Sequence, residues 1–231
     1  LWTSANKDLW CASTASSYDS DLGMPVINAS FTDWTRSENY FFHSEAVAGV
    51  DIIMGEEQIV ISEMDLTAGT EDGSYNTNQM LSCTNDGICG IGIVGLFPGG
   101  VDDISDISNN HTGIFKMSEN HGASWHGCNG SAEQGCAPSG DGTGYYFIPD
   151  NVWDDMMATQ FNYEYTDECD GTTDLINDFW TYYDPDFKVD SEGNPHWVIQ
   201  TLGCGAEFCY YMPESGIYHF TIDRNYLDNP G

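Results

Sequence analysis

The sequence predicts an all-β chain of antiparallel strands joined by long surface loops. Its β-prone runs are short and rich in Ile, Val, Tyr, Phe and Trp. Clusters of Gly, Asp, Asn and Pro bound these runs, as expected where strands end in turns. Helical signals are weak by comparison. Short strands at nearly regular spacing therefore favour a sandwich, a barrel or a propeller.

The expected elements follow from these runs in chain order. Two strands are expected within 49–64, and others at 87–97, 112–118, 144–149, 161–166, 179–184, 196–202, 208–213 and 216–223. Short helices are expected at 151–161 ("NVWDDMMATQF") and at 172–180 ("TTDLINDFW"). The polar stretches 65–82 and 128–143 are expected to be surface loops. No Pro-rich or Gly/Ser-rich linker divides the chain, so a single domain over residues 1–231 is predicted.

The cysteine spacing predicts disulfides and hence an oxidising compartment. Three pairs bracket short Gly-containing segments whose turns can bring the two sulfurs together, and the two cysteines left over would then pair by elimination. The alternative is zinc, but no pair has Cys-x-x-Cys spacing. The candidates are Cys83 with Cys89, Cys128 with Cys136, Cys204 with Cys209, and Cys11 with Cys169.

The charge balance excludes several classes of partner. The chain has 37 Asp plus Glu against five Lys plus Arg, a formal net charge of −32. Such a field repels nucleic acid, anionic lipid and polyanionic glycans, and it attracts cations. No apolar run is long enough to insert into a membrane as a helix. The chain starts with Leu1 and is expected to be a mature extracellular or cell-surface product, or a piece of a longer protein.

The stretch "SENHGASW" at 118–125 carries a recognisable turn motif. Its residues Ser118, Asn120, Gly122, Ser124 and Trp125 match Ser-x-Asp-x-Gly-x-Thr-Trp, with Asn in place of Asp and Ser in place of Thr. The chain thus resembles the BNR or Asp-box repeat β-propellers, a family with a sialidase-like fold. The segment "GNPH" at 193–196 is similar to a second stretch of such blades.

This resemblance implies a partial propeller of about four blades, in which the motif is a hairpin lock between the third and fourth strands of a blade. Gly122 would supply a positive φ and Asn120 would bond its own turn. His121 and His126 are expected to be exposed turn residues rather than metal ligands. A sialidase site would need three arginines to grip a carboxylate, and the chain has only Arg36 and Arg224. No catalytic residue is therefore assigned.

Calcium is the expected metal, if one is bound. In "TDECDGTTD" the carboxylates of Asp167, Asp170 and Asp174 surround a Gly-containing turn and offer hard oxygen ligands. The alternative is a solvated acidic loop, and the spacing does not fit an EF-hand. No other cofactor is predicted.

Three functions remain open on the sequence. The first is a secreted or cell-surface scaffold or binding module, non-catalytic, whose partner is a protein, a neutral glycan or calcium. The paired tyrosines of "GYY", "TYYD" and "CYYM" would each place one ring outside, although the blade core also consumes aromatics. The second is part of a glycan-active hydrolase completed by residues outside this sequence, with carboxylate pairs such as Asp154 with Asp155 or Asp184 with Asp186 as candidates. The third is a structural subunit of a surface assembly.

Overall fold

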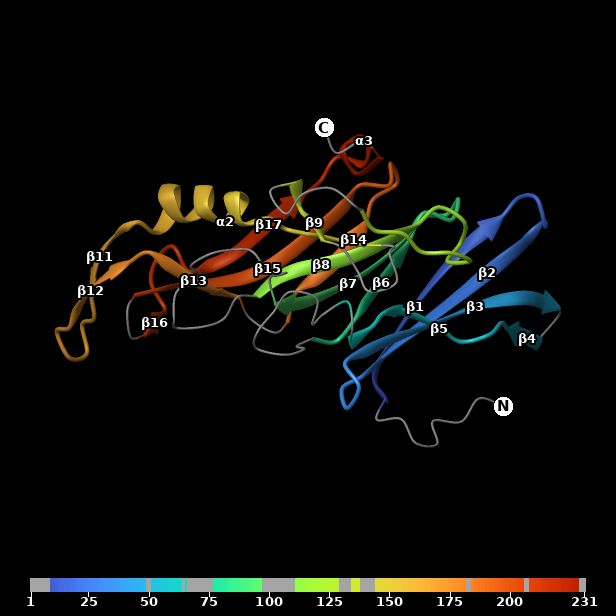
Figure 1. Cartoon of the computed structure of the whole chain (residues 1–231), viewed down its shortest axis with the longest axis horizontal. Helices are drawn as coiled ribbons and strands as arrows, with labels where there is room; N and C mark the ends of the chain where they lie inside the picture. Colours follow the sequence, from blue (N-terminus) through green and yellow to red (C-terminus); the bar gives the residue numbers. More distant parts are fainter. Residues whose placement is uncertain are drawn as a thin grey trace.

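The chain folds mainly into antiparallel β-sheets (Figure 1). The computed structural model describes residues 9–48, 51–63, 65, 77–96, 111–128, 134–137, 144–181, 184–205 and 208–228. The predicted antiparallel β-structure with disulfides is confirmed. The predicted loop regions 65–82 and 128–143 lie largely outside the described residues.

The first sheet comes from the N-terminal part of the chain. Its strands are β1 (Leu9–Asp19), β2 (Met24–Asp33), β3 (Glu38–Ala48), β4 (Asp51–Met54) and β5 (Gln58–Ile61), with β4 and β5 both pairing with β3. The inward positions of β2 are polar, because Asn28, Ser30 and Thr32 are all fully buried. Only β4 and β5 of this sheet were predicted from the sequence.

The central sheet has the order β6-β7-β8-β10-β9. Its strands are β6 (Met80–Cys83), β7 (Cys89–Leu96), β8 (His111–Ser118), β9 (Cys136–Ala137) and β10 (Tyr145–Phe147). Every residue of β8 is buried, so both faces of this sheet are covered. Strands covered on both faces lose the alternation of polar and apolar residues, which explains the continuous apolar run "ICGIGIVGL".

A short helical segment and a hairpin follow the central sheet. The helix α2 (Asp150–Met156) continues into a π-helical turn, η2 (Met157–Phe161), as predicted for 151–161. Strands β11 (Tyr163–Thr166) and β12 (Thr173–Ile176) then form a separate hairpin. The predicted helix at 172–180 is wrong. Thr173–Ile176 form β12 and pair with β11 instead, and Asp178–Thr181 form a strand of the third sheet.

The third sheet is built around the long strand β15 (Pro195–Cys204). The strands β14 (Asp186–Val189) and β17 (Gly216–Thr221) pair with its first part, and β13 (Asp178–Thr181) and β16 (Cys209–Tyr210) with its last. A one-turn helix, α3 (Arg224–Asp228), follows β17. Alternation along β15 buries Trp197 and Ile199, whereas Val198 is exposed.

Glycines in the central sheet allow the third sheet to pack directly on its backbone. A Cβ atom at Gly92 would lie 2.8 Å from the rings of Phe187 and Trp197, and one at Gly113 would lie 2.9 Å from Trp197. The same holds at Gly90, where Phe187 would be 2.7 Å away. Aromatic rings therefore occupy the space that side chains on these three residues would fill.

The other face of the central sheet packs against the first sheet. Strand β6 contacts β1 and β2, and the amide of Asn28 donates to the sulfur of Cys83 at 3.3 Å. Phe41 of β3 meets Trp125 edge to face, with ring centroids 4.8 Å apart. The central sheet thus lies between the other two, as Figure 1 shows. One apolar cluster runs through all three sheets.

Three disulfides are formed as predicted: Cys83–Cys89, Cys128–Cys136 and Cys204–Cys209. The predicted fourth bridge is wrong. Cys169 is a free, exposed thiol in the β11–β12 turn, whereas Cys11 belongs to β1. Figure 1 places β1 and this hairpin at far-apart positions along the molecule. Three disulfides fit an oxidising compartment.

The described sheets form neither a closed barrel nor a complete propeller. The described part of the chain also contains no helix long and apolar enough to cross a membrane.

The glycine packing generates a first prediction. Gly92→Ala should lower the free energy of unfolding by about 1–3 kcal/mol, because the added methyl group overlaps the rings of Phe187 and Trp197. Urea unfolding followed by tryptophan fluorescence measures the change. Gly216→Ala is the matched control, since the nearest atom to its added Cβ would be 4.0 Å away. Equal stabilities of the two variants would contradict the packing account.

Candidate functional site

The turn at 118–125 is held by its own side chains. The Ser118 hydroxyl accepts hydrogen bonds from the backbone N–H groups of Asn120 at 3.3 Å and Gly122 at 3.0 Å. The Asn120 Oδ1 accepts from the Ser124 N–H at 2.9 Å, and its Nδ2 donates to the Ser124 hydroxyl at 2.9 Å. These are the hydrogen bonds that the turn chemistry predicts.

Gly122 is required in this turn for two reasons. Its φ of +88° lies in the left-handed region, and a Cβ there would lie 2.2 Å from the ring of Phe41. Phe41 in turn packs against Trp125. Gly122 and Trp125 therefore hold the turn against Phe41 of the first sheet, while Ser118, Asn120 and Ser124 bond within the turn.

The two histidines near this turn have structural contacts. His121 has a φ of 61°, and its Nδ1 lies 2.8 Å from the hydroxyl of Ser17 in β1. Its backbone N–H donates to the Gly87 carbonyl at 2.9 Å. His126 forms an isolated β-bridge with Met117, with both N···O distances below 3 Å. The expectation that His121 and His126 are exposed turn residues is wrong for both, because each is half-buried and bonded to a neighbouring segment.

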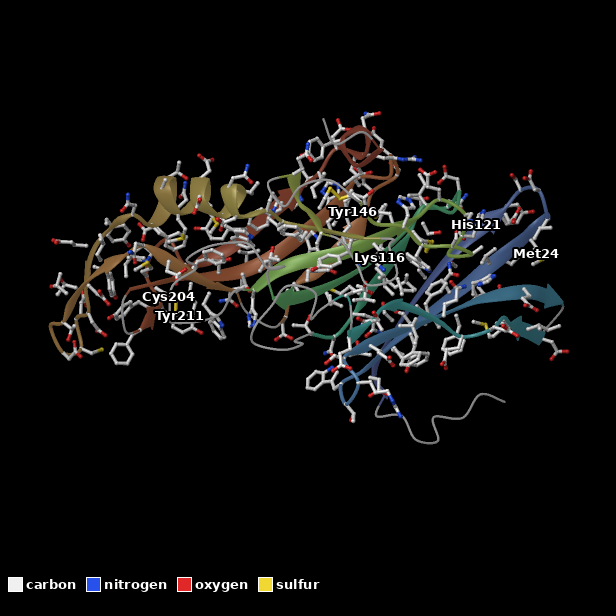
Figure 2. All side chains as sticks on the ribbon, in the orientation of Figure 1. Met24, Lys116, His121, Tyr146, Cys204 and Tyr211 are labelled. Carbon is white, nitrogen blue, oxygen red and sulfur yellow. A yellow bond between two sulfur atoms is a disulfide. The ribbon has the colours of Figure 1, made fainter. Side chains whose placement is uncertain are left out.

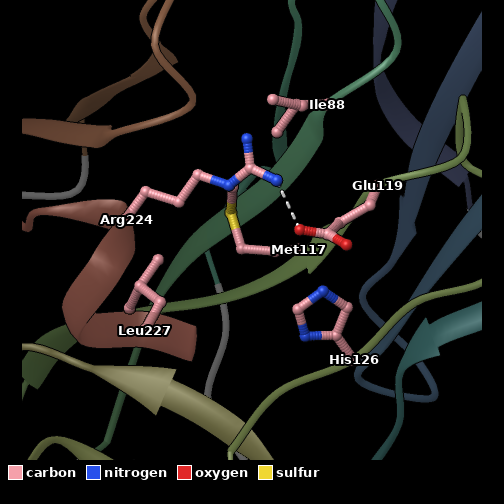
Figure 3. Close-up of a pocket in the computed structure, with 6 residues that line it drawn as sticks. All are labelled: Ile88, Met117, Glu119, His126, Arg224 and Leu227. Carbon is pink, nitrogen blue, oxygen red and sulfur yellow. Dashed lines mark hydrogen bonds and ion pairs between the residues drawn. The ribbon is translucent and has the colours of Figure 1, made fainter. Parts of the chain in front are cut away.

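A small pocket lies beside the turn (Figure 3). In that view the guanidinium of Arg224 reaches across it to the carboxylate of Glu119, 2.5 Å away. The enclosed space is ≈ 10 Å³, about the room of one water molecule. The pocket is lined by Ile88, Met117, Glu119, His126, Arg224 and Leu227. It is too small for a sugar ring or a peptide side chain.

An open polar cleft of ≈ 300 Å³ adjoins it, lined by Glu192, Asn194, Asp223, Arg224 and Asn225. Its polar groups are engaged with one another. The Asn194 Oδ1 accepts from the Arg224 N–H at 2.9 Å, and the Asp223 carboxylate accepts from Asn225 at 2.8 Å. The first of these bonds ties the β14–β15 turn to α3, and the second lies at the start of α3.

In the described part of the chain each Lys and Arg side chain lies in an ion pair. Arg36 pairs with Asp33 at 2.7 Å, the buried Lys116 with Asp65 at 3.5 Å, and Lys188 with Asp186 at 3.7 Å. Arg36 lies in the β2–β3 turn and Arg224 in α3, on different sheets. The carboxylate pairs Asp154 with Asp155 and Asp184 with Asp186 are all exposed, on α2 and before β14.

The predicted calcium ligands lie on the β11–β12 hairpin. Asp167 and Asp170 each accept a backbone N–H of their own turn at 2.8 Å, from Cys169 and Thr172. Asp174 is the second residue of β12, and its carboxylate is 3.5 Å from the Tyr210 hydroxyl. In the described residues no group of three His, Cys, Asp or Glu side chains is arranged to hold a metal ion. Calcium binding here stays a prediction.

The loop closed by Cys204–Cys209 presents exposed aromatic rings. Phe208 is 60% exposed and Tyr211 is 69% exposed. Between them in sequence, Tyr210 is buried against Tyr165 of β11, with ring centroids 5.2 Å apart. Figure 2 places Cys204 and Tyr211 at the same end of the molecule as the β11–β12 hairpin. We call Phe208, Tyr211 and the neighbouring Asp174 the aromatic end.

A nearby tyrosine extends the polar surroundings of the aromatic end. Tyr163 donates to the Glu214 carboxylate and also contacts the sulfur of Met212. Burial, together with the bond to Glu214, raises the pKa of Tyr163 to about 12. The phenol therefore stays protonated at neutral pH and keeps its hydrogen bond.

A histidine pair lies on the outer face of the third sheet. The Nδ1 of His196 is 2.9 Å from the Nε2 of His219, and the Nε2 of His196 is 3.0 Å from the Asp190 carboxylate. Sequence reasoning assigned His196 only to a blade motif and missed the pair. Part of this arrangement could have been predicted from the sequence. Both histidines lie next to aromatic residues in predicted strands, and neighbouring residues of a strand face opposite sides of the sheet.

Comparisons with protein-family models, with curated proteins and with solved structures found no match. The resemblance to the Asp-box propellers therefore stays a prediction based on the motif.

The turn geometry generates a second prediction. Ser118→Ala should lower the free energy of unfolding by about 1–3 kcal/mol, because the buried N–H of Gly122 loses its acceptor. Ser124→Ala, at the exposed side of the same turn, should change it by no more than about 0.5 kcal/mol. Chemical unfolding of both variants measures the difference. A larger loss for Ser124→Ala would show that the turn is held from its outer side instead.

Proposed function

We propose that this chain is a non-catalytic binding module of an extracellular or cell-surface protein, and that its ligand is a neutral glycan. The observation that carries the proposal is the exposure of Phe208, on the loop closed by Cys204–Cys209, and of Tyr211, two residues after that bridge. Sugar rings present apolar C–H faces that stack on aromatic rings, while their hydroxyls donate to carboxylates such as Asp174.

The described ends of this loop are held together. The Gly205 N–H donates to the Phe208 carbonyl at 2.9 Å, and the Cys204–Cys209 bridge links the strands on either side. A Cβ at Gly205 would lie 2.1 Å from the Asp174 carboxylate, so Gly205 lies directly against β12. A ligand that stacks on Phe208 therefore meets a backbone position that is already fixed, which lowers the entropy cost of binding.

The net charge selects the chemistry of the ligand. At −32 the chain disfavours sialylated, sulfated or uronate-rich glycans, whereas a neutral glycan carries no such penalty. The pocket between Arg224 and Glu119 is too small to enclose a sugar ring, which favours binding at the surface.

We also propose that the three sheets are blades of a propeller. The remaining blades would then be formed by residues outside this sequence. Support comes from the antiparallel strands of the three sheets, from their packing face to face in chain order, and from the position of the Asp-box turn. That turn follows β8, the third strand of the central sheet along the chain, where the family resemblance predicts it.

Assembly is a second candidate, favoured by the edge strand β4. All four residues of β4 are exposed, and Ile52, Ile53 and Met54 are apolar. An exposed apolar edge strand is a template for pairing with another chain. This observation fits a structural subunit of a surface assembly.

Glycan binding generates a third prediction. Tyr211→Ala should weaken binding about 2- to 12-fold, because a lost stacking contact is worth about 0.5–1.5 kcal/mol. Binding is measured on an array of neutral and acidic oligosaccharides and by titration with each neutral oligosaccharide retained. Tyr18→Ala, which removes a ring 47% exposed on the first sheet, is the control. The proposal fails if no neutral oligosaccharide binds, or if both variants weaken binding equally.

Assembly generates a fourth prediction. If β4 mediates self-association, sedimentation velocity should show a mass that rises with concentration, and Ile53→Lys should abolish the rise by placing a charge on the edge. Leu22→Lys changes an equally exposed residue in the β1–β2 turn and should leave the association intact. A parent chain that stays monomeric at every concentration argues against this second candidate.

A further inference from the structure

We infer that the outer face of the third sheet binds a divalent transition-metal ion, with His196 Nδ1 and His219 Nε2 as its two protein ligands. The two residues are diagonal neighbours on adjacent antiparallel strands, because His196 pairs with Thr221 and Val198 pairs with His219. Diagonal neighbours share one face of a sheet and lie within reach of long side chains. Nothing in the glycan proposal depends on this site.

The two imidazoles already point their nitrogens at one another. The nitrogens are 2.9 Å apart, the ring centroids 5.1 Å apart, and the ring planes differ by 6°. The distance between the ring centroids exceeds the distance between the nitrogens by nearly twice the radius of an imidazole ring. The line between the two nitrogens therefore runs outward from each ring, and the rings meet edge to edge rather than face to face. Each ring therefore directs a nitrogen, and when deprotonated a lone pair, into the same small space.

A metal ion requires only a small opening of this pair. Bonds of about 2.0–2.1 Å at a tetrahedral ion place two ligand nitrogens about 3.3 Å apart, slightly wider than the hydrogen bond they replace. The rings must also tilt, and histidine χ2 rotates in broad wells at little cost. His219 is exposed, so its ring has room to turn.

Asp190 fixes the orientation and the tautomer of His196. Its carboxylate accepts the Nε2–H at 3.0 Å, which leaves Nδ1 as the nitrogen with a lone pair. Carboxylate–histidine–metal arrangements of this kind are typical of metal centres, where the carboxylate orients the ligand and raises its basicity. Asp190 acts here as a positioning residue.

The β14–β15 turn holds Asp190 in place. Asp190 accepts the backbone N–H groups of Glu192 at 2.8 Å and Asn194 at 2.9 Å, and the Asn194 side chain at 3.0 Å. These three hydrogen bonds hold the Asp190 carboxylate in a fixed position beside His196.

The chemistry of the donors selects the ion. Two imidazoles suit Zn²⁺, Ni²⁺ or Cu²⁺, whereas Ca²⁺ and Mg²⁺ prefer oxygen ligands. Since no third His, Cys, Asp or Glu of the described residues joins the pair, water fills the remaining positions. Lys188 lies opposite His196 in the register, but its ammonium is 3.7 Å from Asp186, which offsets its charge. The net charge of −32 raises the local concentration of cations.

Calorimetric titration with ZnCl₂ and with NiCl₂ tests the site. The parent is a chelator-stripped chain with Cys169→Ser, which removes the exposed thiol as a competing ligand. His219→Gln is the main variant, since His219 touches the β14–β15 turn only through His196. It should weaken binding at least about tenfold, as should His196→Gln, and Asp190→Asn should weaken it about 10–100-fold. His43→Gln, which removes a half-buried histidine of β3, should bind as the parent does.

Nitrogen-15 spectra of the imidazoles give a second readout. In the parent, Zn²⁺ should shift the His196 Nδ1 and His219 Nε2 signals and leave the backbone spectrum of α3 and the turns unchanged. The inference is overturned if the parent binds neither ion, or if Ca²⁺ displaces the bound ion at equal concentration. It is also overturned if His196→Gln and His219→Gln both bind the ion as the parent does. A loss of affinity in His43→Gln equal to that of the two variants would overturn it as well.

Discussion

The packing of aromatic rings onto bare backbone between the central and third sheets is the constraint on which much of this structure depends. Gly92 and Gly113 carry no side chain, and Trp197 occupies the space above them. Closely packed interiors leave no alternative place for such a ring. This contact therefore sets the spacing between the two sheets.

The same contact determines what the third sheet presents to solvent. Successive residues of a strand face opposite sides, so burying Trp197 turns its neighbours His196 and Val198 outward. Phe220 of β17 packs against the core cluster, which turns His219 outward on the same face. The histidine pair is thus a consequence of where the aromatic residues are buried. A shift of β17 by one residue would separate the two imidazoles.

The sequence predicts elements well where burial is apolar and fails where it is polar. Apolar β-forming residues dominate strands β7, β8, β15 and β17, so the sequence predicted all four. The three local disulfides were predicted because only short segments separate their cysteines. Strands β1 to β3 were missed, since the inward Asn28 and Thr32 remove the alternating apolar signal. For the sites, the turn at 118–125 follows from local chemistry alone. The pairing of His196 with His219, 23 residues apart, requires the register of two strands, which no local pattern contains.

The two proposed binding surfaces depend on different forces. The charge of the chain affects ligand binding at one of them far more than at the other. Four basic side chains are bound to carboxylates, so they neutralise individual acids and leave a surface whose field is dominated by the remaining Asp and Glu. Attraction of a divalent ion toward His196 and His219 is long-ranged and weakens as salt shortens the Debye length to about 8 Å at physiological ionic strength. Stacking on Phe208 and Tyr211 buries apolar area and does not weaken with salt in this way. We therefore expect a rise in ionic strength to weaken the proposed metal binding more than the proposed glycan binding.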